Sequence, residues 1–472
     1  MNTQYEIKCE YREFPADTLT PVGVYLRLRD VYPGSLLLEC TDFSSRTNAY
    51  SYVCINPIMG IEVDENNIKR YFPGGNEEKL PLHDVANNVD ALIRSIRVAT
   101  GGTGKGVHGF FGFTSFDSLF LFEKFDQSLE QKVSRQREIP FLKYDFFKIV
   151  LAFNHFNDTL LITEYYNADM PAGEIEKVLS ILSNRNFTGY PFRLIGDEIS
   201  SIGDSDFKKM VSEAIKHCAV GDVFQMVVSR HYKQQFQGDE FNVYRSLRSV
   251  NPSPYLFYFD YINYKIFGSS PEAQLKIQNG KAIINPIAGT IHRTGDAIAD
   301  YNSAQELLRN PKENSEHVML VDLARNDLSR SCTNVNVDVY KEVQAFSHLW
   351  HLVSTVSGDL NAEESPFRVF ARTFPAGTLS GAPKHKAIEL ITGMEANPRG
   401  YYGGAIGYIS LDGSLNHAIL IRSFLSRESY LNYQAGAGIV INSTEQGELN
   451  EVGNKLDALR TALKKATTYT IF

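Results

Sequence analysis

Short turn sequences between alternating apolar stretches are the feature that most limits how this chain can fold. Asn157-Asp158 interrupts KIVLAFNHFNDTLLITEYY, Asn279-Gly280 interrupts AQLKIQNGKAIINP, and Asp412-Gly413 interrupts GAIGYISLDGSLNHAILIRSF. Asn-Gly and Asp-Gly pairs are the strongest short-range signals for β-hairpins, whose strands are antiparallel. Helices are expected between these hairpins, at residues 206–219, 304–327, 384–395 and 448–465. We therefore predict an α+β sandwich of antiparallel sheets flanked by helices rather than a parallel doubly wound fold.

A polar, turn-rich segment at residues 185–205 predicts where the chain divides. Its sequence, NRNFTGYPFRLIGDEISSIGD, is rich in glycine, asparagine and serine. Such a composition is typical of connections between folded units. With 472 residues, the chain is long enough for two large domains. We therefore predict an N-terminal domain at residues 1–199 and a second domain at residues 200–472.

The charge balance and the placement of apolar residues narrow the classes of partner. A net charge of −8 argues against nucleic acid and against an anionic membrane surface. The sequence has no run of 18 apolar residues, and its first residues lack the apolar core of a signal peptide. The cysteines are scattered without a C-x-x-C pair, as expected of free thiols in a reducing compartment: Cys9, Cys40, Cys54, Cys218 and Cys332. We expect a soluble, cytoplasmic protein.

Two of the expected helices carry pairs of glutamates beside an apolar stripe. The charged positions are Glu313 and Glu316 in residues 310–330, and Glu448, Glu451 and Lys455 in residues 448–465. Taken alone, either set could be a solvated, salt-bridged helix edge, which is the common arrangement. If the two helices face each other, four carboxylates without a Cys or His pattern suit Mg²⁺ rather than Zn²⁺. Such a clamp predicts an anionic ligand between the helices.

Other residues could hold the far end of such an anion. Glycine-rich turns at residues 400–408 and 434–440 can present backbone N–H groups to a carboxylate. Arg422 stands between apolar residues in LIRSF and could bind a carboxylate, although an internal Arg–Asp bridge is an equal alternative. His351 follows an apolar run and could shuttle a proton, or it could be a satisfied core histidine.

The motifs of the second half occur in an order that resembles the chorismate-binding enzymes. They are NPIAGT, SEHVMLVDLARNDLSR, HLVSTVSG, FPAGTLSGAPKHKAIELI, YYGGAIGYI, IRSF and QAGAGIVINST, spread densely over residues 200–465. The N-terminal half matches more thinly, through LLLEC and GFFGFTSFDSLFLFE. Within the family, the chain is most similar to the members that form anthranilate. The resemblance implies a large sandwich of antiparallel sheets flanked by helices, which agrees with the hairpins.

The resemblance also implies a role for individual residues. Glu316 and Glu451 resemble direct Mg²⁺ ligands, and Glu313 and Glu448 resemble partners that act through water. The remaining substrate-binding positions it implies are Tyr402 and Arg422 for the enolpyruvyl carboxylate, Lys455, Gly436 and Gly438 for the ring carboxylate, and Ala288, Gly289 and Thr290 in NPIAGT. Thr378 would line the same pocket. Glu272 resembles the general acid for the departing hydroxyl, and His351 the residue needed when a ring proton and pyruvate are lost.

Ala288 and Gln225 stand at positions where other family members carry a lysine, and their identity indicates which nucleophile attacks the ring. Family members that make 4-amino-4-deoxychorismate commonly carry a nucleophilic lysine where Ala288 stands. Members that make isochorismate carry a water-activating lysine where Gln225 stands. The resemblance therefore implies an Mg²⁺-dependent lyase that uses external ammonia and converts chorismate into anthranilate and pyruvate. The alternative is the formation of 4-amino-4-deoxychorismate, since the lysine rule has exceptions.

A partner and an inhibitor follow from the same resemblance. No cysteine stands in a tight glycine turn typical of a glutaminase, so ammonia is expected from a separate glutamine amidotransferase subunit. LLLEC and NPSPYLF resemble the L-tryptophan site of feedback-inhibited members. The matching positions are Glu39, Cys40, Pro254, Tyr255 and Leu256, of which Cys40 and Leu256 depart from the usual serine and methionine. A plain buried strand is the alternative interpretation of LLLEC.

Overall fold

The computed structural model describes residues 5–40, 49–100, 108–134, 137–184, 186–345 and 349–469. The helices are α1 Pro21–Leu28, α2 Val85–Arg94, α3 Leu119–Phe122, α4 Gln127–Ser134, α5 Glu174–Ser183, α6 Asp204–Val220, α7 Phe241–Val250, α8 Ala297–Arg309, α9 Pro311–Ser329, α10 Pro366–Thr373, α11 Lys384–Met394 and α12 Glu445–Ala466. The strands are β1 Tyr5–Pro15, β2 Leu36–Cys40, β3 Tyr50–Val63, β4 Asn67–Tyr71, β5 Glu77–Pro81, β6 Ile96–Thr100, β7 Gly109–Thr114, β8 Leu142–Asn154, β9 Thr159–Tyr166, β10 Phe192–Ser200, β11 Gln225–Gly238, β12 Tyr255–Asp260, β13 Tyr264–Ser270, β14 Ala273–Gln278, β15 Lys281–Ile284, β16 Ile287–His292, β17 Cys332–Ala345, β18 Leu349–Leu360, β19 Gly381–Ala382, β20 Ala405–Ser410, β21 Leu415–Ile419, β22 Ser423–Arg427 and β23 Tyr430–Ile439.

The strands form two sheets that are joined through β3 and β8. The first sheet has the order β10–β11–β23–β22–β13–β12–β2–β3–β8–β9–β1–β6. The second has the order β5–β4–β3–β8–β7–β20–β21–β14–β15–β18–β17, with β16 also on β18. Among the described pairs, only β1–β6 is parallel. The predicted α+β sandwich is confirmed.

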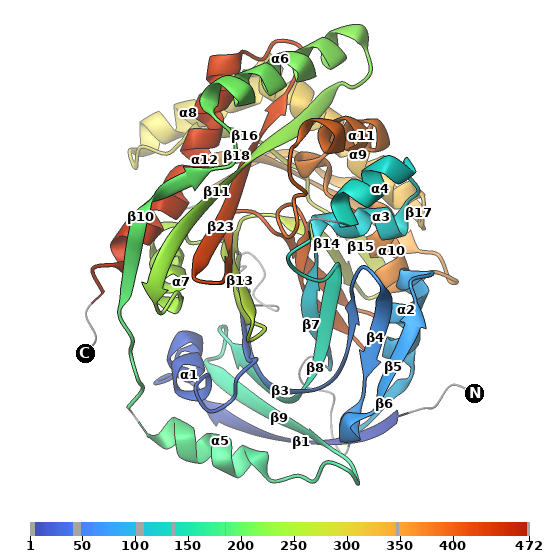
Figure 1. The fold of residues 1–472 in the computed structure, drawn as a ribbon, viewed down its shortest axis with the longest axis vertical. Coiled ribbons are helices and arrows are strands. Elements are labelled where there is room, and N and C mark those ends of the chain that lie inside the picture. The colour runs from blue at the N-terminus through green and yellow to red at the C-terminus, as the bar shows by residue number, and fades with distance from the viewer. Residues whose placement is uncertain are drawn as a thin grey trace.

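Strict alternation along the strands places one core between the sheets and another beneath the helices. In β2, Leu36 and Leu38 belong to the cluster shared by both sheets, whereas Leu37 packs in the cluster that includes helices α1, α6, α7 and α12. Successive side chains of a strand point to opposite faces, so a strand covered on both sides is apolar throughout. Figure 1 shows α6 and α12 beside β11 and β23 at the top of the view, with α1 and α5 near β9 at the bottom.

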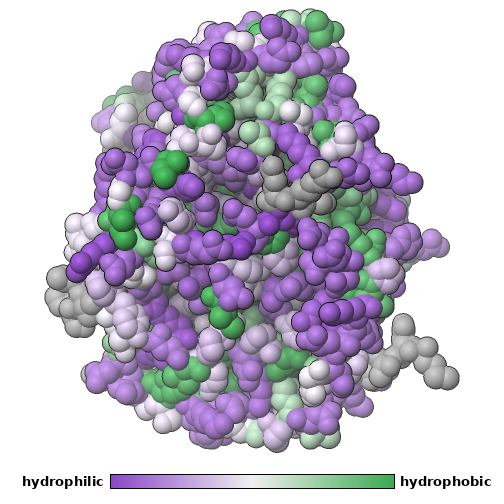
Figure 2. Space-filling model, viewed as in Figure 1, coloured by the Kyte–Doolittle hydropathy of each residue, from purple (hydrophilic) through white to green (hydrophobic). Residues whose placement is uncertain are grey.

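The surface drawn in Figure 2 is mainly hydrophilic. On the face drawn in Figure 2, hydrophobic residues appear as separate spots within a mainly hydrophilic surface. Isolated apolar residues of this kind are normal on a folded protein. Within the described residues, no helix has both the length and the apolar character needed to cross a membrane.

The three predicted hairpins are confirmed. Asn279 and Gly280 join β14 to β15 with φ of 52° and 73°. Positive φ at both central residues is the geometry for which Asn-Gly is favoured, because its twist matches that of the strands. The hairpins β8–β9 and β20–β21 enclose the other two turn sequences.

Two local predictions were wrong. The stretch 304–327 is not one helix: α8 ends at Arg309 and α9 begins at Pro311, because Asn310 caps α9 by accepting from the backbone N–H of Lys312 and Glu313. The polar segment 185–205 is not a bare connection, because it contains strand β10, which pairs with β11. The division at 199/200 itself stays a prediction, and the pairs β2–β12 and β7–β20 cross it.

Candidate active site

A cavity of about 620 Å³ opens where both sheets meet helices α9 and α12. Its volume lies in the range of small-molecule sites. Its lining includes the predicted residues Gln225, Glu272, Ala288, Gly289, Glu313, Glu316, His351, Thr378, Tyr402, Arg422, Gly436, Gly438, Glu448, Glu451 and Lys455. The side chain of Thr290 lies outside the described part of the structure. The sequence motifs therefore converge in one cavity, although they are spread over more than 200 residues.

The wall formed by β11 and β23 shows why glycines are needed there. Gly438 pairs with Val227 across the strands, and a Cβ on Gly438 would lie 2.3 Å from Gln225 Nε2. A Cβ on Gly436 would lie 3.2 Å from the Tyr402 hydroxyl. These glycines keep the backbone open to the cavity, where its N–H groups can face an anion.

Glu272 combines burial with a hydrogen bond from a neighbouring hydroxyl. It lies between β13 and β14, and its side chain accepts a hydrogen bond of 2.9 Å from Thr378 Oγ1. Burial raises the pKa of Glu272 to about 7, because desolvation disfavours the carboxylate. A carboxyl group with this pKa can donate a proton near neutral pH, as a general acid must.

Arg422 is held in an unusual backbone conformation beside Glu272. Its φ is 49°, which is uncommon for a residue with a side chain and often marks a functional position. Its Nη1 donates to Asn251 Oδ1 at 3.4 Å, and burial lowers its pKa. None of the ion pairs between described residues involves Arg422, so the alternative of an internal Arg–Asp bridge has no support. The guanidinium can therefore bind a substrate carboxylate.

His351 is oriented by a backbone carbonyl. Its Nδ1 lies 2.8 Å from the Gly289 carbonyl oxygen, an acceptor, so Nδ1 carries the proton and Nε2 is the basic atom. Burial lowers the pKa of His351, which keeps the ring neutral at pH 7. A neutral imidazole with a fixed tautomer can take a proton from a substrate.

The four glutamates face the same cavity from α9 and α12. Burial raises the pKa of Glu316, and the nearby carboxylates of Glu313 and Glu448 raise it further. Lys455 donates to the Gly436 carbonyl oxygen at 2.9 Å and lies 3.4 Å from Glu451. Crowded carboxylate oxygens of this kind are the donors that Mg²⁺ prefers.

Among the described residues, however, no three metal-binding side chains are close enough to hold an ion by themselves. An anionic substrate would have to complete the shell, and the metal stays a prediction.

The sequence patterns did not identify a buried ion pair behind the cavity wall. Arg399 pairs with Glu395 at 2.8 Å and donates to the carbonyl oxygens of Val227 and Leu379, while Glu395 accepts from Ser229. Val227 and Leu379 line the cavity. The pair fixes these two segments against each other. The spacing of four between Glu395 and Arg399 was visible in the sequence, but not that the pair would be buried.

The residues of the predicted tryptophan site lie on neighbouring strands. Cys40 pairs with Tyr255, and Glu39 pairs with Leu256, across β2 and β12, with Pro254 just before β12. The buried Glu39 carboxylate already accepts hydrogen bonds from Tyr244 at 2.5 Å and from Arg248 at 3.0 Å. Because neighbours alternate in direction, Glu39 and Leu256 face the helices, whereas Cys40 and Tyr255 face the core between the sheets. Inhibitor binding there stays a prediction.

Comparisons with known proteins agree with this geometry. A family model described as chorismate binding enzyme matches residues 38–461. Anthranilate synthase component 1 of Bacillus caldotenax is 33% identical, covering 96% of this chain and 93% of that protein. The Saccharomyces cerevisiae protein of the same name is 34% identical, covering 97% and 92%. The crystal structure of anthranilate synthase component I from Streptococcus pneumoniae matches with a TM-score of 0.74 at 31% identity, covering 87% of this chain and 92% of that one. The menaquinone-specific isochorismate synthase of Escherichia coli also gives 0.74, at 17% identity, and so shares the fold.

Proposed function

This chain belongs to the family of chorismate-binding enzymes, and we propose that it converts chorismate and ammonia into anthranilate and pyruvate. The observation that carries the proposal is the pair Ala288 and Gln225. Both line the cavity that contains Glu272 and His351. Neither can act as the lysine that attacks the ring, or as the lysine that activates water, in other branches of the family. An external amine is therefore the nucleophile that the cavity can accept.

The residues of the cavity divide the chemistry into two steps. Ammonia bonds to the ring carbon next to the one that carries the carboxylate. The ring double bonds shift, and the hydroxyl leaves as water with the proton of Glu272. The new ammonium group then loses one proton, which can restore the acid. This forms 2-amino-2-deoxyisochorismate. His351 then accepts the proton of the aminated carbon while the enolpyruvyl C–O bond breaks. The departing enolpyruvate takes up a proton at its methylene carbon, which gives anthranilate and pyruvate.

Substrate orientation falls to charged and hydroxyl groups around the cavity. Arg422 and Tyr402 are suited to the enolpyruvyl carboxylate, and burial raises the pKa of Tyr402 to about 12, so its hydroxyl remains a donor. Lys455 and the backbone near Gly436 are suited to the ring carboxylate. Mg²⁺ bound by Glu316 and Glu451, with Glu313 and Glu448 nearby, would supply positive charge to that carboxylate.

The same proposal includes the source of ammonia and the inhibition of the enzyme by L-tryptophan. Ammonia would come from glutamine through a separate amidotransferase subunit, as expected for a chain whose described cysteines are all free thiols and mostly buried. L-Tryptophan would inhibit by binding at the β2–β12 strand pair. Calorimetric titration with L-tryptophan tests this, and an absence of heat would favour a purely structural strand.

A product assay tests the proposed reaction. The purified chain would be incubated with chorismate, Mg²⁺ and ammonium chloride at alkaline pH, and products separated while anthranilate fluorescence is followed. We expect anthranilate and pyruvate in equal amounts. An aminated product that keeps its enolpyruvyl group would instead assign the chain to 4-amino-4-deoxychorismate formation.

A further inference from the structure

The buried face of helix α9 has a polar residue near each of its ends. The buried side chains lie at helical spacing and are His317, Val321, Ala324, Asp327 and Leu328. A buried polar side chain is costly unless it forms hydrogen bonds. The polar residues at the two ends of this face therefore need partners on other elements, and each partner fixes one end of the helix.

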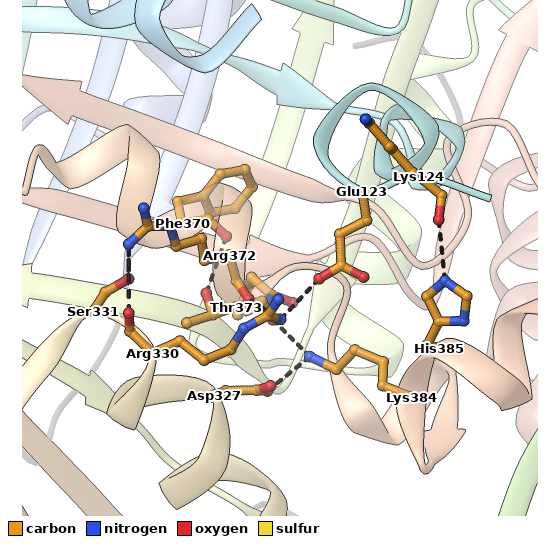
Figure 3. A network of polar contacts seen from close by, with 11 residues as sticks. Glu123, Lys124, Asp327, Arg330, Ser331, Phe370, Arg372, Thr373, Lys384 and His385 are labelled. Atoms are coloured by element: carbon orange, nitrogen blue, oxygen red, sulfur yellow. Dashed lines mark hydrogen bonds and ion pairs between the residues drawn. The ribbon is translucent and has the colours of Figure 1, made fainter. Parts of the chain in front are cut away.

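Asp327 holds the C-terminal end of α9. Lys384 Nζ, at the start of α11, donates to Asp327 Oδ2 at 2.7 Å and to the Thr373 carbonyl oxygen at 2.9 Å. Figure 3 shows this ion pair together with that of Glu123 and Arg330, whose charged groups lie 2.8 Å apart. These contacts fix the end of α9 that is farther from its two glutamates.

His317 holds the other end, about 15 Å along the helix from Asp327. Its Nε2 lies 2.6 Å from Ser354 Oγ on β18, and both side chains are fully buried. Glu316 directly precedes His317, and it lines the active-site cavity. His351, three residues before Ser354, lines the same cavity. One hydrogen bond therefore joins the helix that carries Glu316 to the strand that carries His351.

The hydroxyl of Ser354 also supports a bulge in the neighbouring strand β17. The register with β18 shifts between Val339 and Glu342, so two residues of β17 stand opposite Ser354. One of them, Lys341, has φ of 56°, and its backbone N–H donates to Ser354 Oγ at 2.9 Å. Bulges and left-handed residues with a side chain are costly features that often lie at functional sites. Ser354 therefore joins α9, β17 and β18 at one point.

The backbone of Ser354 fixes the segment that orients His351. Its N–H donates to the Pro286 carbonyl oxygen at 3.0 Å. Three residues after Pro286, the Gly289 carbonyl oxygen lies 2.8 Å from His351 Nδ1. Helix α9 lies close to this segment, because a Cβ added to Gly289 would be 3.2 Å from Glu313 Oε2. A shift of α9 would therefore disturb both its glutamates and the group that orients His351.

We propose that His317 and Ser354 are positioning residues, whose hydrogen bond fixes the glutamate-bearing end of α9 against β18. The bond thereby sets the place of Glu316 relative to His351 in the active-site cavity. The inference rests on the proposed function, because it uses the roles given there to Glu316 and His351. A buried polar contact that is fully formed makes the surrounding structure rigid, and its loss would let this end of α9 shift.

Removing the hydrogen bond from either side tests the proposal. Ser354→Ala deletes the hydroxyl, and His317→Leu deletes the ring nitrogens. We expect each variant to raise the Kd of Mg²⁺ at least tenfold, in calorimetric titrations with chorismate and without ammonia. The kcat for chorismate consumption at saturating Mg²⁺ should also fall at least tenfold. His317→Gln places an amide nitrogen near the position of Nε2 and should restore most of both values. The double variant should be no worse than the more impaired single variant, because both changes remove one bond.

His417 and Tyr144 provide the matched control. His417 is also fully buried, and its Nε2 lies 2.9 Å from the Tyr144 hydroxyl. This contact is between β21 and β8, away from the lining of the active-site cavity. His417→Leu and Tyr144→Phe therefore remove a comparable hydrogen bond with a comparable loss of thermal stability. Both should keep the Kd of Mg²⁺ and the kcat of the wild type.

The outcomes separate positioning from stability. A folded Ser354→Ala variant with the Mg²⁺ affinity and kcat of the wild type would overturn the inference, and it decides the test even if His317→Leu does not fold. Equal losses in Tyr144→Phe would also overturn it, since the effect would then be one of stability alone. A wild type that binds no Mg²⁺ with chorismate present would leave no metal site to position and would refute it as well. A wild-type product that keeps its enolpyruvyl group would refute only the proposed function, because both measurements apply to either product.

Discussion

Glu272 should make the reaction rate depend on pH, because burial raises the pKa of its carboxyl group. With its pKa raised to about 7, the acid is protonated below that pH and ionised above it. We therefore expect kcat/KM for chorismate, measured at constant free ammonia, to fall as pH rises above about 7. Glu272→Gln cannot donate the proton and should reduce kcat by roughly 10²- to 10⁴-fold with chorismate binding retained. A pH profile of the wild type that stays flat from pH 6 to 9 would argue against this role.

The same shift affects stability. The folded pKa of Glu272 lies above its ordinary value, so the folded state binds more protons than the unfolded state between that value and about 7. The contribution to the free energy of unfolding is present at low pH and is lost as pH rises through this window. Denaturant unfolding at pH 5 and pH 8 should show a smaller decrease for Glu272→Gln than for the wild type.

Ala288 offers a test of the nucleophile at a single position. Ala288→Lys places an amine in the cavity that contains Glu272. We expect anthranilate formation from ammonia to fall at least tenfold, and mass spectrometry to detect chorismate-derived mass on the protein. Ala288→Met, with similar bulk and no amine, is the matched control and should show no adduct. Undiminished anthranilate formation in the lysine variant would contradict the importance of this position.

Single-residue identities were readable from the sequence, but their partners were not. Glu272 and His351 stand in recognisable motifs, and both line the cavity. The groups that tune them lie far away in the chain: Thr378 is 106 residues from Glu272, and the Gly289 carbonyl is 62 residues from His351. These hydrogen bonds, and the burial that raises the pKa of Glu272, depend on the tertiary structure, so no local pattern could predict them.

Helices α9 and α12 both line the active-site cavity, and the glutamates that they place there predict metal affinity. Their glutamates face one cavity, where burial and then the like charges of Glu313 and Glu448 raise the pKa of Glu316. A divalent cation would relieve that repulsion. We expect Glu316→Gln to weaken Mg²⁺ binding at least tenfold in calorimetric titrations performed with chorismate present. Glu306→Gln, on the exposed side of the adjacent helix α8, should bind Mg²⁺ like the wild type. Equal affinity in both variants would remove Glu316 from the metal site.

Element boundaries were predictable where a local signal was strong. Hairpin turns with positive φ followed from Asn-Gly and Asp-Gly. The break at Asn310-Pro311 also has a signal, since asparagine caps and proline starts a helix, but the apolar pattern continues on both sides and predicts a single helix. Strand β10 was missed because its pattern is mostly exposed, and its pairing with β11 stabilises it without an apolar face.

At the scale of the whole molecule, strand order was beyond local reasoning. β2 lies beside β12 although more than 200 residues separate them, and β7 lies beside β20. Such pairings depend on how the two sheets pack in the tertiary structure, and no motif within either strand specifies them. They also tie the two predicted halves into the same sheets, so we expect residues 1–199 and 200–472 to unfold together.

Gly112 in β7 allows this cooperativity to be measured. It pairs with Gly407 of β20 and Tyr144 of β8, and a Cβ there would lie 2.0 Å from the Lys143 carbonyl oxygen. Gly112→Ala should therefore lower the free energy of unfolding by about 1–3 kcal/mol, as overpacking does.

The protein has one tryptophan, Trp350 on β18, which reports on the second half. If the halves are one cooperative unit, the unfolding midpoint seen by Trp350 fluorescence falls together with that seen by circular dichroism. Gly393→Ala in α11, where an added Cβ meets nothing within 4 Å, should not lower it. A Trp350 midpoint that stays in place while the circular dichroism midpoint falls would mean that the halves unfold independently, despite the strand pairs they share.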